Sequence, residues 1–268
     1  MKAARIAGAL LLVAPAVFAG VIRLDVAVMS HANAEETSVL VVLQNSGDEA
    51  AREVRVEGVL AGLARTNAPV DLAPEASSEA EMIFPSSALP PGLHMAEFRV
   101  RYRDGNGYPF STVAVRPVQA GAAPGPARVS ATLVPAVLTD TGRLRARLWL
   151  QAGASPATVS LRLLVADDLA CDMPDRTVAL FPGRPVMVEA ALSNRTGRAG
   201  SVYPVFIIVT EAGRGPVREM AARGVITLER GGATAFPWPG LAFAVAMILA
   251  LLFVIAQAGG KGRRSRET

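Results

Sequence analysis

The sequence predicts an all-β fold of two tandem β-sandwiches, followed by one transmembrane helix at the carboxyl end. Three observations support this. Between residues 21 and 230, short segments alternate apolar and polar side chains, which is the period of half-buried strands. Turn residues separate these segments at the short intervals typical of sandwiches. Residues 241–258 then form an uncharged run close to the length that spans a bilayer.

The first 20 residues have the layout of a secretory signal peptide. Lys2 and Arg5 precede the apolar run Ile6–Phe18, and the small residues Ala19 and Gly20 close it. We expect cleavage near these small residues. An uncleaved anchor helix is the alternative, which the shortness of the apolar run disfavours. In both cases the segment that follows is predicted to lie outside the cytoplasm.

Residues 21–118 are predicted to form the first sandwich. Thr37–Leu43 and Glu53–Leu60 are expected strands, separated by the turn sequence NSGDEA. Further on, the segment FRVRYR is expected to place Phe98, Val100 and Tyr102 on one face of a strand. Three arginines project from the other face of that strand: Arg99, Arg101 and Arg103.

A tight turn is predicted directly after this strand, because Asp104–Gly107 (DGNG) supplies the Asn and Gly that a β-hairpin requires. Residues 119–128 are rich in Gly, Pro and Ala and are predicted to form a linker. Residues 129–230 form the predicted second sandwich.

The second half repeats features of the first half at offsets of about 105 to 108 residues. Leu43-Gln44 corresponds to Leu150-Gln151, and the strand that follows each pair also corresponds. Glu97–Gly107 resembles Val205–Gly215 in the same way. We interpret this repetition as an internal duplication of a domain of about a hundred residues.

The first half resembles the bacterial immunoglobulin-like modules of the cell-adhesion-related, CARDB-like group. The stretches LQNSGDEAAREVRV and LPPGLHMAEFRVRYRD carry the resemblance, through turn and core residues: Asn45, Gly47, Ala51, Val54, Val56, Pro91 and Gly92. The similarity covers roughly Thr37–Val118 and is weaker in the second half, where Ala152 replaces the turn Asn. It implies two immunoglobulin-like sandwiches with extracytoplasmic binding, spacing or assembly roles, and no catalysis.

The carboxyl end is predicted to anchor the protein in the membrane. Residues 231–240 are the expected juxtamembrane linker, with Trp238 at headgroup level. The transmembrane helix is expected over residues 241–258. Residues 259–268 form a basic tail, which basic residues favour on the cytoplasmic side: Lys261, Arg263, Arg264 and Arg266.

Charge and cysteine content exclude other classes of protein. The formal charge is +4, but the basic residues of both ends account for it, and the exported part carries 21 positive and 22 negative side chains. This balance gives no support to a nucleic-acid partner. One cysteine, Cys171, cannot form an internal disulfide, and a buried, inert thiol is expected there; an intermolecular bridge or a reactive thiol is the alternative.

Catalytic and metal-binding patterns are weak. His31 and His94, near Met29 and Met95, could hold copper only if they met in space. Paired acids lie in expected turns, where solvated side chains are the ordinary case: Glu35, Glu36, Asp167, Asp168, Asp172 and Asp175. These acids are less suited to glycosidase chemistry than to calcium, and neither use has a recognisable motif. Neither an enzymatic activity nor a cofactor is therefore expected.

Two arginine stripes are the candidate partner-binding residues. Arg99, Arg101 and Arg103 lie on one predicted strand face, and Arg143, Arg145 and Arg147 lie on another. A solvated outer face that discourages edge aggregation is the simpler interpretation. Contact with an acidic partner, such as an anionic polysaccharide, a lipid headgroup or a protein, is the functional one.

These observations predict a non-catalytic, single-pass membrane protein that acts as an extracytoplasmic binding or scaffold subunit of a cell-envelope complex. The expected location is the cytoplasmic membrane of a bacterium. The alternative is a surface adhesive or structural protein whose carboxyl-terminal helix is a processed sorting signal, although Phe236–Gly240 (FPWPG) matches no sorting motif known to us. A copper-handling protein or an enzyme that uses both histidines is the third hypothesis.

Overall fold

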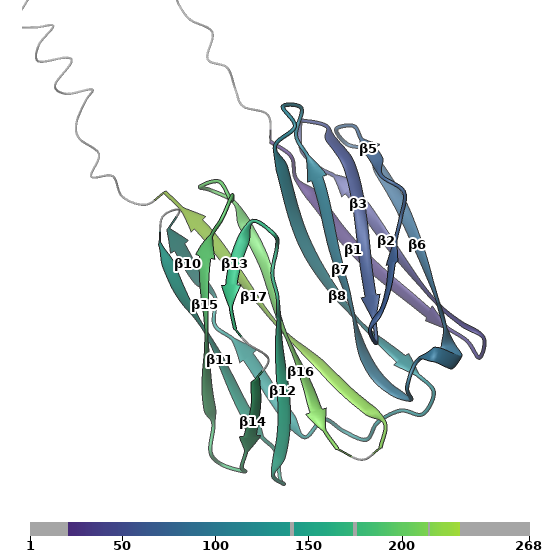
Figure 1. Cartoon of the computed structure of the whole chain (residues 1–268), viewed down its shortest axis with the longest axis vertical. Helices are drawn as coiled ribbons and strands as arrows, with labels where there is room; N and C mark the ends of the chain where they lie inside the picture. The colour runs from purple at the N-terminus through teal and green to yellow at the C-terminus, as the bar shows by residue number, and fades with distance from the viewer. Residues whose placement is uncertain (1–20, 140–141, 174–175, 214, 231–268) are drawn as a thin grey trace, which may run out of the picture.

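The computed structural model describes residues 21–139, 142–173, 176–213 and 215–230. The predicted signal peptide (1–20), juxtamembrane linker (231–240), transmembrane helix (241–258) and tail (259–268) lie outside the described residues. Within the described part the protein is all-β, as predicted, and the single helical element is a three-residue 3-10 turn (Figure 1). No helix in this part is long and apolar enough to cross a membrane.

The N-terminal half contains two sheets that face each other. One has the strand order β1-β2-β6, and the other runs β4-β3-β7-β8, with β5 also paired to β3. The elements are β1 (Leu24–Ala32), β2 (Glu36–Asn45), β3 (Ala51–Leu60), β4 (Leu63–Thr66), β5 (Val70–Leu72), β6 (Ser77–Pro85), η1 (Ser86–Ala88), β7 (Gly92–Arg103) and β8 (Pro109–Ala120).

Alternation of side chains builds the core of this half. In β2, Val39, Val41 and Leu43 are fully buried, while the residues between them face outward. Phe84, Phe98 and Val100 come from the facing sheets and pack in the same apolar cluster. Residues of one period in each strand therefore form a single core between the two sheets.

The predicted hairpin turn is confirmed between β7 and β8. The Gly107 amide donates to the Asp104 carbonyl at 2.9 Å. The Asp104 carboxylate, which is buried, accepts from the amides of Asn106 and Tyr108 at 2.9 and 2.8 Å. Asp104 thus satisfies the backbone donors that a tight turn leaves unpaired.

The C-terminal half has the same order of strand pairing. One sheet runs β13-β15-β11-β9, and the other contains β14-β12-β16-β17, with β10 parallel to β17. The elements are β9 (Val129–Leu133), β10 (Ala136–Thr139), β11 (Arg143–Ala152), β12 (Ala157–Leu164), β13 (Leu169–Asp172), β14 (Arg176–Leu180), β15 (Val186–Asn194), β16 (Val202–Ala212) and β17 (Val217–Glu229).

Equivalent strands of the two halves keep a constant separation. The starts of β2 and β11, of β3 and β12, and of β8 and β17 lie 106 to 108 residues apart. The sheet β1-β2-β6 corresponds to β9-β11-β15, and β3-β7-β8 corresponds to β12-β16-β17. A separate apolar cluster fills the C-terminal half, with Leu148, Leu161 and Ile207 among its buried residues. Spatial arrangement and sequence offsets therefore give the same pairs of strands.

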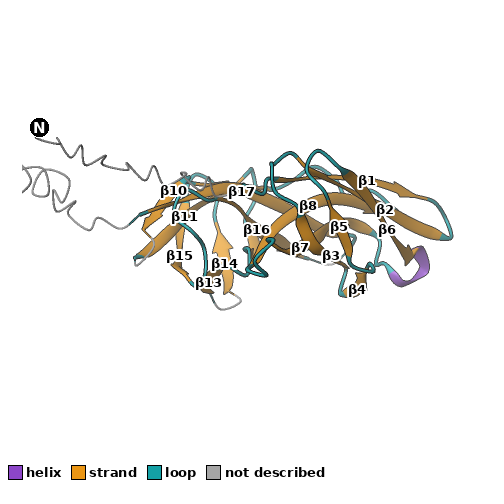
Figure 2. Ribbon diagram, turned by 90° about the horizontal axis from the view of Figure 1, so that it is seen from above, coloured by secondary structure: helices purple, strands orange, loops and turns teal. Residues whose placement is uncertain are grey.

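The two halves are joined into one continuous sheet. β17 pairs in parallel with β7 through Val217–Gly92 and Arg218–Leu93, which links strands of both halves in a ten-stranded sheet. Figure 2 shows the halves end to end, with β10 and β11 toward one end and β1, β2 and β6 toward the other. A third apolar cluster lies where they meet: Met95, Val113, Leu164, Phe206 and Ile208.

The segment predicted as a linker, residues 119–128, is only partly irregular. β8 extends to Ala120, since Gln119 and Ala120 pair with Leu93 and Gly92, and β9 begins at Val129. The segment between them crosses from one half to the other over a contact that the strands and side chains already make. It therefore does not act alone in connecting the two sandwiches.

Candidate interaction surface

The first arginine stripe lies at the contact between the two halves. Arg99 and Arg101, on β7, both reach Asp167 of the C-terminal half, at 3.2 Å and 2.6 Å from its two carboxylate oxygens. Arg101 also donates to Glu57 at 2.9 Å. Arg103, at the end of β7, pairs with Glu53 at 3.1 Å. These guanidinium groups are committed to carboxylates of the same chain.

A buried aspartate strengthens this contact beside the arginines. Asp168 is 2% exposed, and one of its carboxylate oxygens accepts from both the amide and the hydroxyl of Ser111, at 2.9 and 2.8 Å. The Ser111 hydroxyl in turn accepts from the Asp167 amide at 2.7 Å. Burial raises the pKa of the Asp168 carboxyl, and the hydrogen bonds from Ser111 oppose the shift.

Two further ion pairs cross the same contact. Arg162 donates to Glu97 at 2.8 Å, and the buried position of Glu97 raises its pKa even though Arg162 opposes the shift. Arg198 lies over the ring of Tyr108 at 4.4 Å and reaches the Asp104 carboxylate at 3.4 Å. Each of these charges from the C-terminal half meets a complementary group of the N-terminal half.

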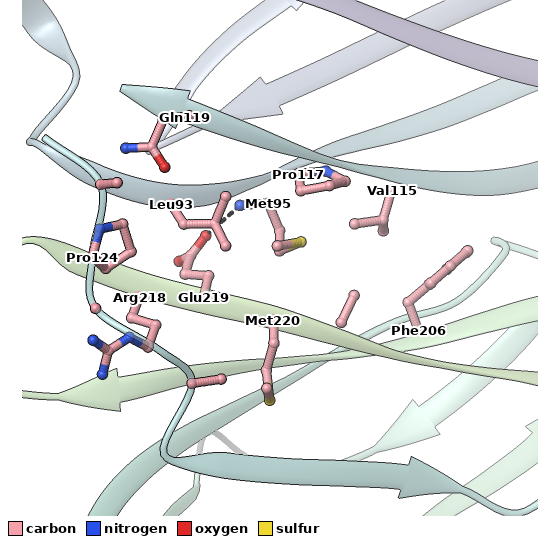
Figure 3. A pocket seen from close by; sticks show the side chains of 14 residues that line it. Leu93, Met95, Val115, Pro117, Gln119, Pro124, Phe206, Arg218, Glu219 and Met220 are labelled. Atoms are coloured by element: carbon pink, nitrogen blue, oxygen red, sulfur yellow. Dashed lines mark hydrogen bonds between the residues drawn. The ribbon is translucent and has the colours of Figure 1, made fainter. Parts of the chain in front are cut away.

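A cavity of about 460 Å³ lies at the same junction, beneath residues 121–128 (Figure 3). Apolar side chains of both halves line it: Leu93, Met95, Val115, Phe206 and Met220. Its charged groups hold the junction together. The Glu219 carboxylate accepts from the Met95 amide at 2.7 Å, and Arg218 donates to Glu211 at 2.7 Å.

Glu211 explains how the crossing segment is fixed at its far end. It is buried and accepts from the Arg128 amide at 3.0 Å as well as from the guanidinium groups of Arg128 and Arg218. Burial alone would raise the pKa of Glu211, but these hydrogen bonds outweigh burial and leave the pKa lowered. The carboxylate therefore stays charged and holds the start of β9 in place.

The second arginine stripe is in a different environment. Arg143, Arg145 and Arg147 lie on the outer face of β11, in the sheet that is remote from the N-terminal half. Arg145 and Arg147 share one carboxylate, Glu189 of β15, at 3.3 and 3.5 Å. Three positive charges against one negative charge leave this face basic. Their guanidinium groups remain more than half exposed where the structure records these pairs.

Exposed apolar side chains continue this second stripe. Trp149 follows Arg147 on the same face and lies opposite Met187 of β15, and they are 44% and 43% exposed. On the other side, the Val134 amide donates to the Arg147 carbonyl at 3.0 Å, so Val134 lies beside Arg147 and is also exposed. We call this surface the basic face: Arg143, Arg145, Arg147, Trp149, Met187 and Val134.

The sequence contained one sign of Trp149 that the stripe alone missed. In the alternation that starts at Arg143, Trp149 occupies the same parity as the three arginines and so faces outward with them. Met187 and Val134 could not be found in this way, because cross-strand pairing brings them from other segments. A large aromatic side chain on an outer face is more informative than exposed aliphatic ones.

The histidines and paired acids do not form a site. His94 is buried, and its Nε2 is 2.7 Å from the Pro90 carbonyl, whereas His31 is exposed on β1. Met29 is exposed and Met95 packs at the junction. Among the described residues, which omit Asp175, no three His, Cys, Asp or Glu side chains gather as metal ligands would. Asp167 and Asp168 belong to the junction, and the Glu35 and Glu36 amides donate to Asn33.

The expectation of a buried cysteine was wrong. Cys171 is exposed on β13, a four-residue strand at the edge of its sheet that pairs only with β15 among the described strands. An edge strand has a neighbour on one side only, so the packing that would have covered the thiol is absent. Partial desolvation still raises the pKa of the Cys171 thiol.

Comparisons with known proteins show a fold likeness at low similarity. No protein-family model and no curated protein sequence matches this chain. Solved structures that resemble it include red sea bream transglutaminase, at 11% identity over 79% of this chain with a TM-score of 0.27. Alpha-2-macroglobulin of Escherichia coli matches at 15% identity over 78% of this chain, with a TM-score of 0.31.

Smaller proteins match over most of their own length. A Porphyromonas gingivalis W83 protein of unknown function matches at 14% identity, with a TM-score of 0.29, over 75% of this chain and 98% of its own. The chaperone YadV matches at 14% identity, with a TM-score of 0.28, over 69% and 91%. By contrast, this chain covers only 32% of the transglutaminase and 22% of the macroglobulin.

Proposed function

We propose that this protein is a non-catalytic, single-pass membrane-anchored binding or scaffold subunit of a bacterial cell-envelope complex. In this proposal both halves are immunoglobulin-like sandwiches of the CARDB-like kind and lie outside the cytoplasm. The predicted signal peptide, carboxyl-terminal helix and basic tail supply the topology. The short tail leaves the exported part as the region that meets partners.

The observation that carries this proposal is the basic face. It combines exposed arginines with an exposed tryptophan and methionine, which are residue types enriched where proteins bind partners. The first stripe, by contrast, is occupied at the junction by Asp167, Glu57 and Glu53. Arg145 and Arg147 are therefore the better candidates for contact with an acidic partner, such as an envelope protein or an anionic polysaccharide.

The junction supports a scaffold role in a second way. Sheet pairing, an apolar cluster and several ion pairs hold the two halves in one orientation. A rigid body presents its surfaces at a set distance and angle, and a partner loses less entropy in binding to it. A pair of sandwiches on a flexible linker would not provide this.

The test is affinity purification of the full chain from gently solubilised membranes, with a tag after Thr268. The expected result is the signal-cleaved chain at its full remaining mass, together with a stoichiometric envelope partner. Recovery of a short carboxyl-terminal fragment would instead indicate the processed sorting signal of the alternative hypothesis. Recovery of the whole chain without any partner would contradict the scaffold proposal.

Charge reversal assigns the binding to the basic face. The double variant Arg145→Glu, Arg147→Glu is expected to lose the partner, because both cations become anions. The matched control is Arg176→Glu, an exposed arginine on β14 in the other sheet of the same half. If both variants retain the partner equally, the basic face is not the binding site.

A further inference from the structure

A second open sheet face lies at the opposite side of the molecule from the basic face. It belongs to the sheet β1-β2-β6, whose inner face packs in the N-terminal core. Figure 1 shows β2 and β6 on the side away from the C-terminal half, and β11 and β15 on the side away from the N-terminal half. The two faces therefore point away from each other in one rigid chain.

This second face has the opposite charge. Glu79 and Glu81 project outward from β6, since the residues that alternate with them, Ala80 and Met82, are buried. Asp25 projects from β1, with Arg23 at 4.0 Å as the one cation paired to it among the described residues. Three acids against one cation leave this face negative.

Apolar side chains lie between these acids, as they do on the basic face. By strand pairing, Leu40 of β2 lies between Met29 of β1 and Glu81 of β6, and Val42 lies opposite Glu79. Met29 and Ile83 are about half exposed. We call this surface the acidic face: Asp25, Glu79, Glu81, Met29, Leu40, Val42 and Ile83.

We propose that the acidic face of one copy docks on the basic face of a second copy. The inference rests on the proposed binding role of the basic face and names its partner as this chain itself. Each face combines a strip of apolar side chains with charges of one sign, and the signs are opposite. Docking would place Arg145 and Arg147 against Glu79 and Glu81 while it buries Trp149 and Met187 with Met29 and Ile83.

The symmetry of this contact predicts an open row. Because the two faces differ and point in opposite directions, a copy that uses its acidic face keeps its basic face free for the next copy. Each face covers three strands and runs about 20 Å along them, which is small for a stable interface. Self-association is therefore weak in dilute solution, and attachment to one membrane raises the effective concentration of neighbours.

The experiment uses the full chain in cell membranes. A photoactivatable p-benzoylphenylalanine replaces Thr132, an exposed residue that pairs with Trp149 on the basic face, so that Trp149 itself is kept. Irradiation is expected to give an adduct of twice the mass of one chain. Peptide mass spectrometry is expected to map the second end of the crosslink to β1, β2 or β6.

Charge exchange between two differently tagged copies provides the decisive comparison. The variant Arg145→Glu, Arg147→Glu is expected to reduce the adduct at least about tenfold, while the control Arg176→Glu leaves it unchanged. A copy with Glu79→Arg and Glu81→Arg should also fail alone, and should crosslink when mixed with the first variant. Restoration by the pair shows that both variants fold.

Other results separate this inference from the proposed function. An adduct at Thr132 with a different protein or with a polysaccharide overturns self-docking and leaves the binding role of the basic face intact. Absence of any adduct, in membranes where the chain purifies without a partner, overturns both. Failure of the exchanged pair to crosslink, while each variant reaches the membrane at normal level, also overturns self-docking.

Discussion

Asp168 shows how one residue links the two halves. It is buried, accepts two hydrogen bonds from Ser111 through one oxygen, and has no hydrogen-bond partner for the other oxygen among the described residues. Its main-chain carbonyl also accepts from the amides of Arg195 and Thr196. A buried carboxylate with an unpaired oxygen favours its protonated form, which explains the direction of its pKa shift.

The Asp168 pKa predicts a pH dependence with a definite sign. Because the folded-state pKa is raised, the folded protein binds more protons than the unfolded chain between the ordinary aspartate pKa and the raised one. The contribution of Asp168 to the free energy of unfolding therefore falls as the pH rises through this window. Asp168→Asn cannot titrate, so its stability relative to wild type should increase over the same window.

Thermal unfolding of both proteins at several pH values, followed by circular dichroism of the full chain in detergent, measures this difference. Asp168→Ala is the companion variant, since it leaves the Ser111 amide unpaired and should cost about 1–3 kcal/mol. A stability difference between wild type and Asp168→Asn that stays constant with pH would show that Asp168 does not titrate in this way.

Asn45 is the residue-scale signal behind the family resemblance. It is fully buried at the end of β2, and its amide nitrogen donates to the carbonyls of Glu49, Leu72 and Ala73 at 2.8 to 3.2 Å. Its side-chain oxygen accepts from the Gly47 amide at 3.1 Å. One side chain therefore satisfies backbone groups from two separate loops.

We expect Asn45→Ala to lower the free energy of unfolding by about 2 kcal/mol or more, because several backbone groups lose their partner. The control is Asn106→Ala, in the exposed hairpin turn, where a change within about 0.5 kcal/mol is expected. Thermal melting of the two variants compares them directly. Equal losses in both would mean that the Asn45 hydrogen bonds add little.

At the scale of elements, the pairing of β7 with β17 depends on Gly92. This residue has a φ of 140°, and a side-chain Cβ there would lie 2.1 Å from the Val217 carbonyl oxygen. No side chain fits at that distance. The sequence pattern Pro91-Gly92 predicted a turn before a strand, and the structure adds that the glycine allows a strand of the other half to approach.

Gly92→Ala is expected to push β17 away from β7 and to weaken the junction. Gly183→Ala is the matched control, since Gly183 has a φ of 70° and a Cβ added there would meet no atom within 4 Å. Both variants carry the backbone strain of a positive φ, about 1 kcal/mol, so the steric effect appears as the difference. Hydrogen exchange at the amides of Met95 and Val217 measures it. Equal exchange in both variants would contradict the proposed role of Gly92.

At the scale of the whole molecule, the rigidity of the junction is the property on which both proposals depend. We expect that spin labels at Thr66 and Arg176, in a Cys171→Ser background, report one narrow distance distribution in the wild-type sequence. Thr66 and Arg176 are exposed and lie in different halves. Pulsed electron paramagnetic resonance of the full chain measures this distribution.

The double variant Asp167→Ala, Arg162→Ala should broaden that distribution. It removes the partner of Arg99 and Arg101 and leaves the buried Glu97 without its cation. Arg145→Ala, which removes an ion pair on the outer face, is the control and should leave the distribution narrow. A broad wild-type distribution would show that the halves move independently.

The strands and their faces could be predicted from the sequence because they depend on local alternation. The alternation of Phe98 and Val100 with Arg99 and Arg101 placed the first pair in the core and the second pair outside it, as the structure confirms. The hairpin at Asp104–Gly107 followed from the conformations that Asn and Gly allow. Such features involve residues close in the chain, so their physical cause is present in the sequence itself.

The tertiary structure alone decided what the outward side chains meet. Two arginine stripes of the same pattern have different environments, since Asp167 reaches Arg99 and Arg101 across 66 or more residues while Glu189 leaves the second stripe largely exposed. The exposure of Cys171 and the approach of Met187 to Trp149 likewise depend on neighbouring strands. Alternation determines which way a side chain points, but the packing of distant segments determines whether it meets solvent, an ion-pair partner or another domain.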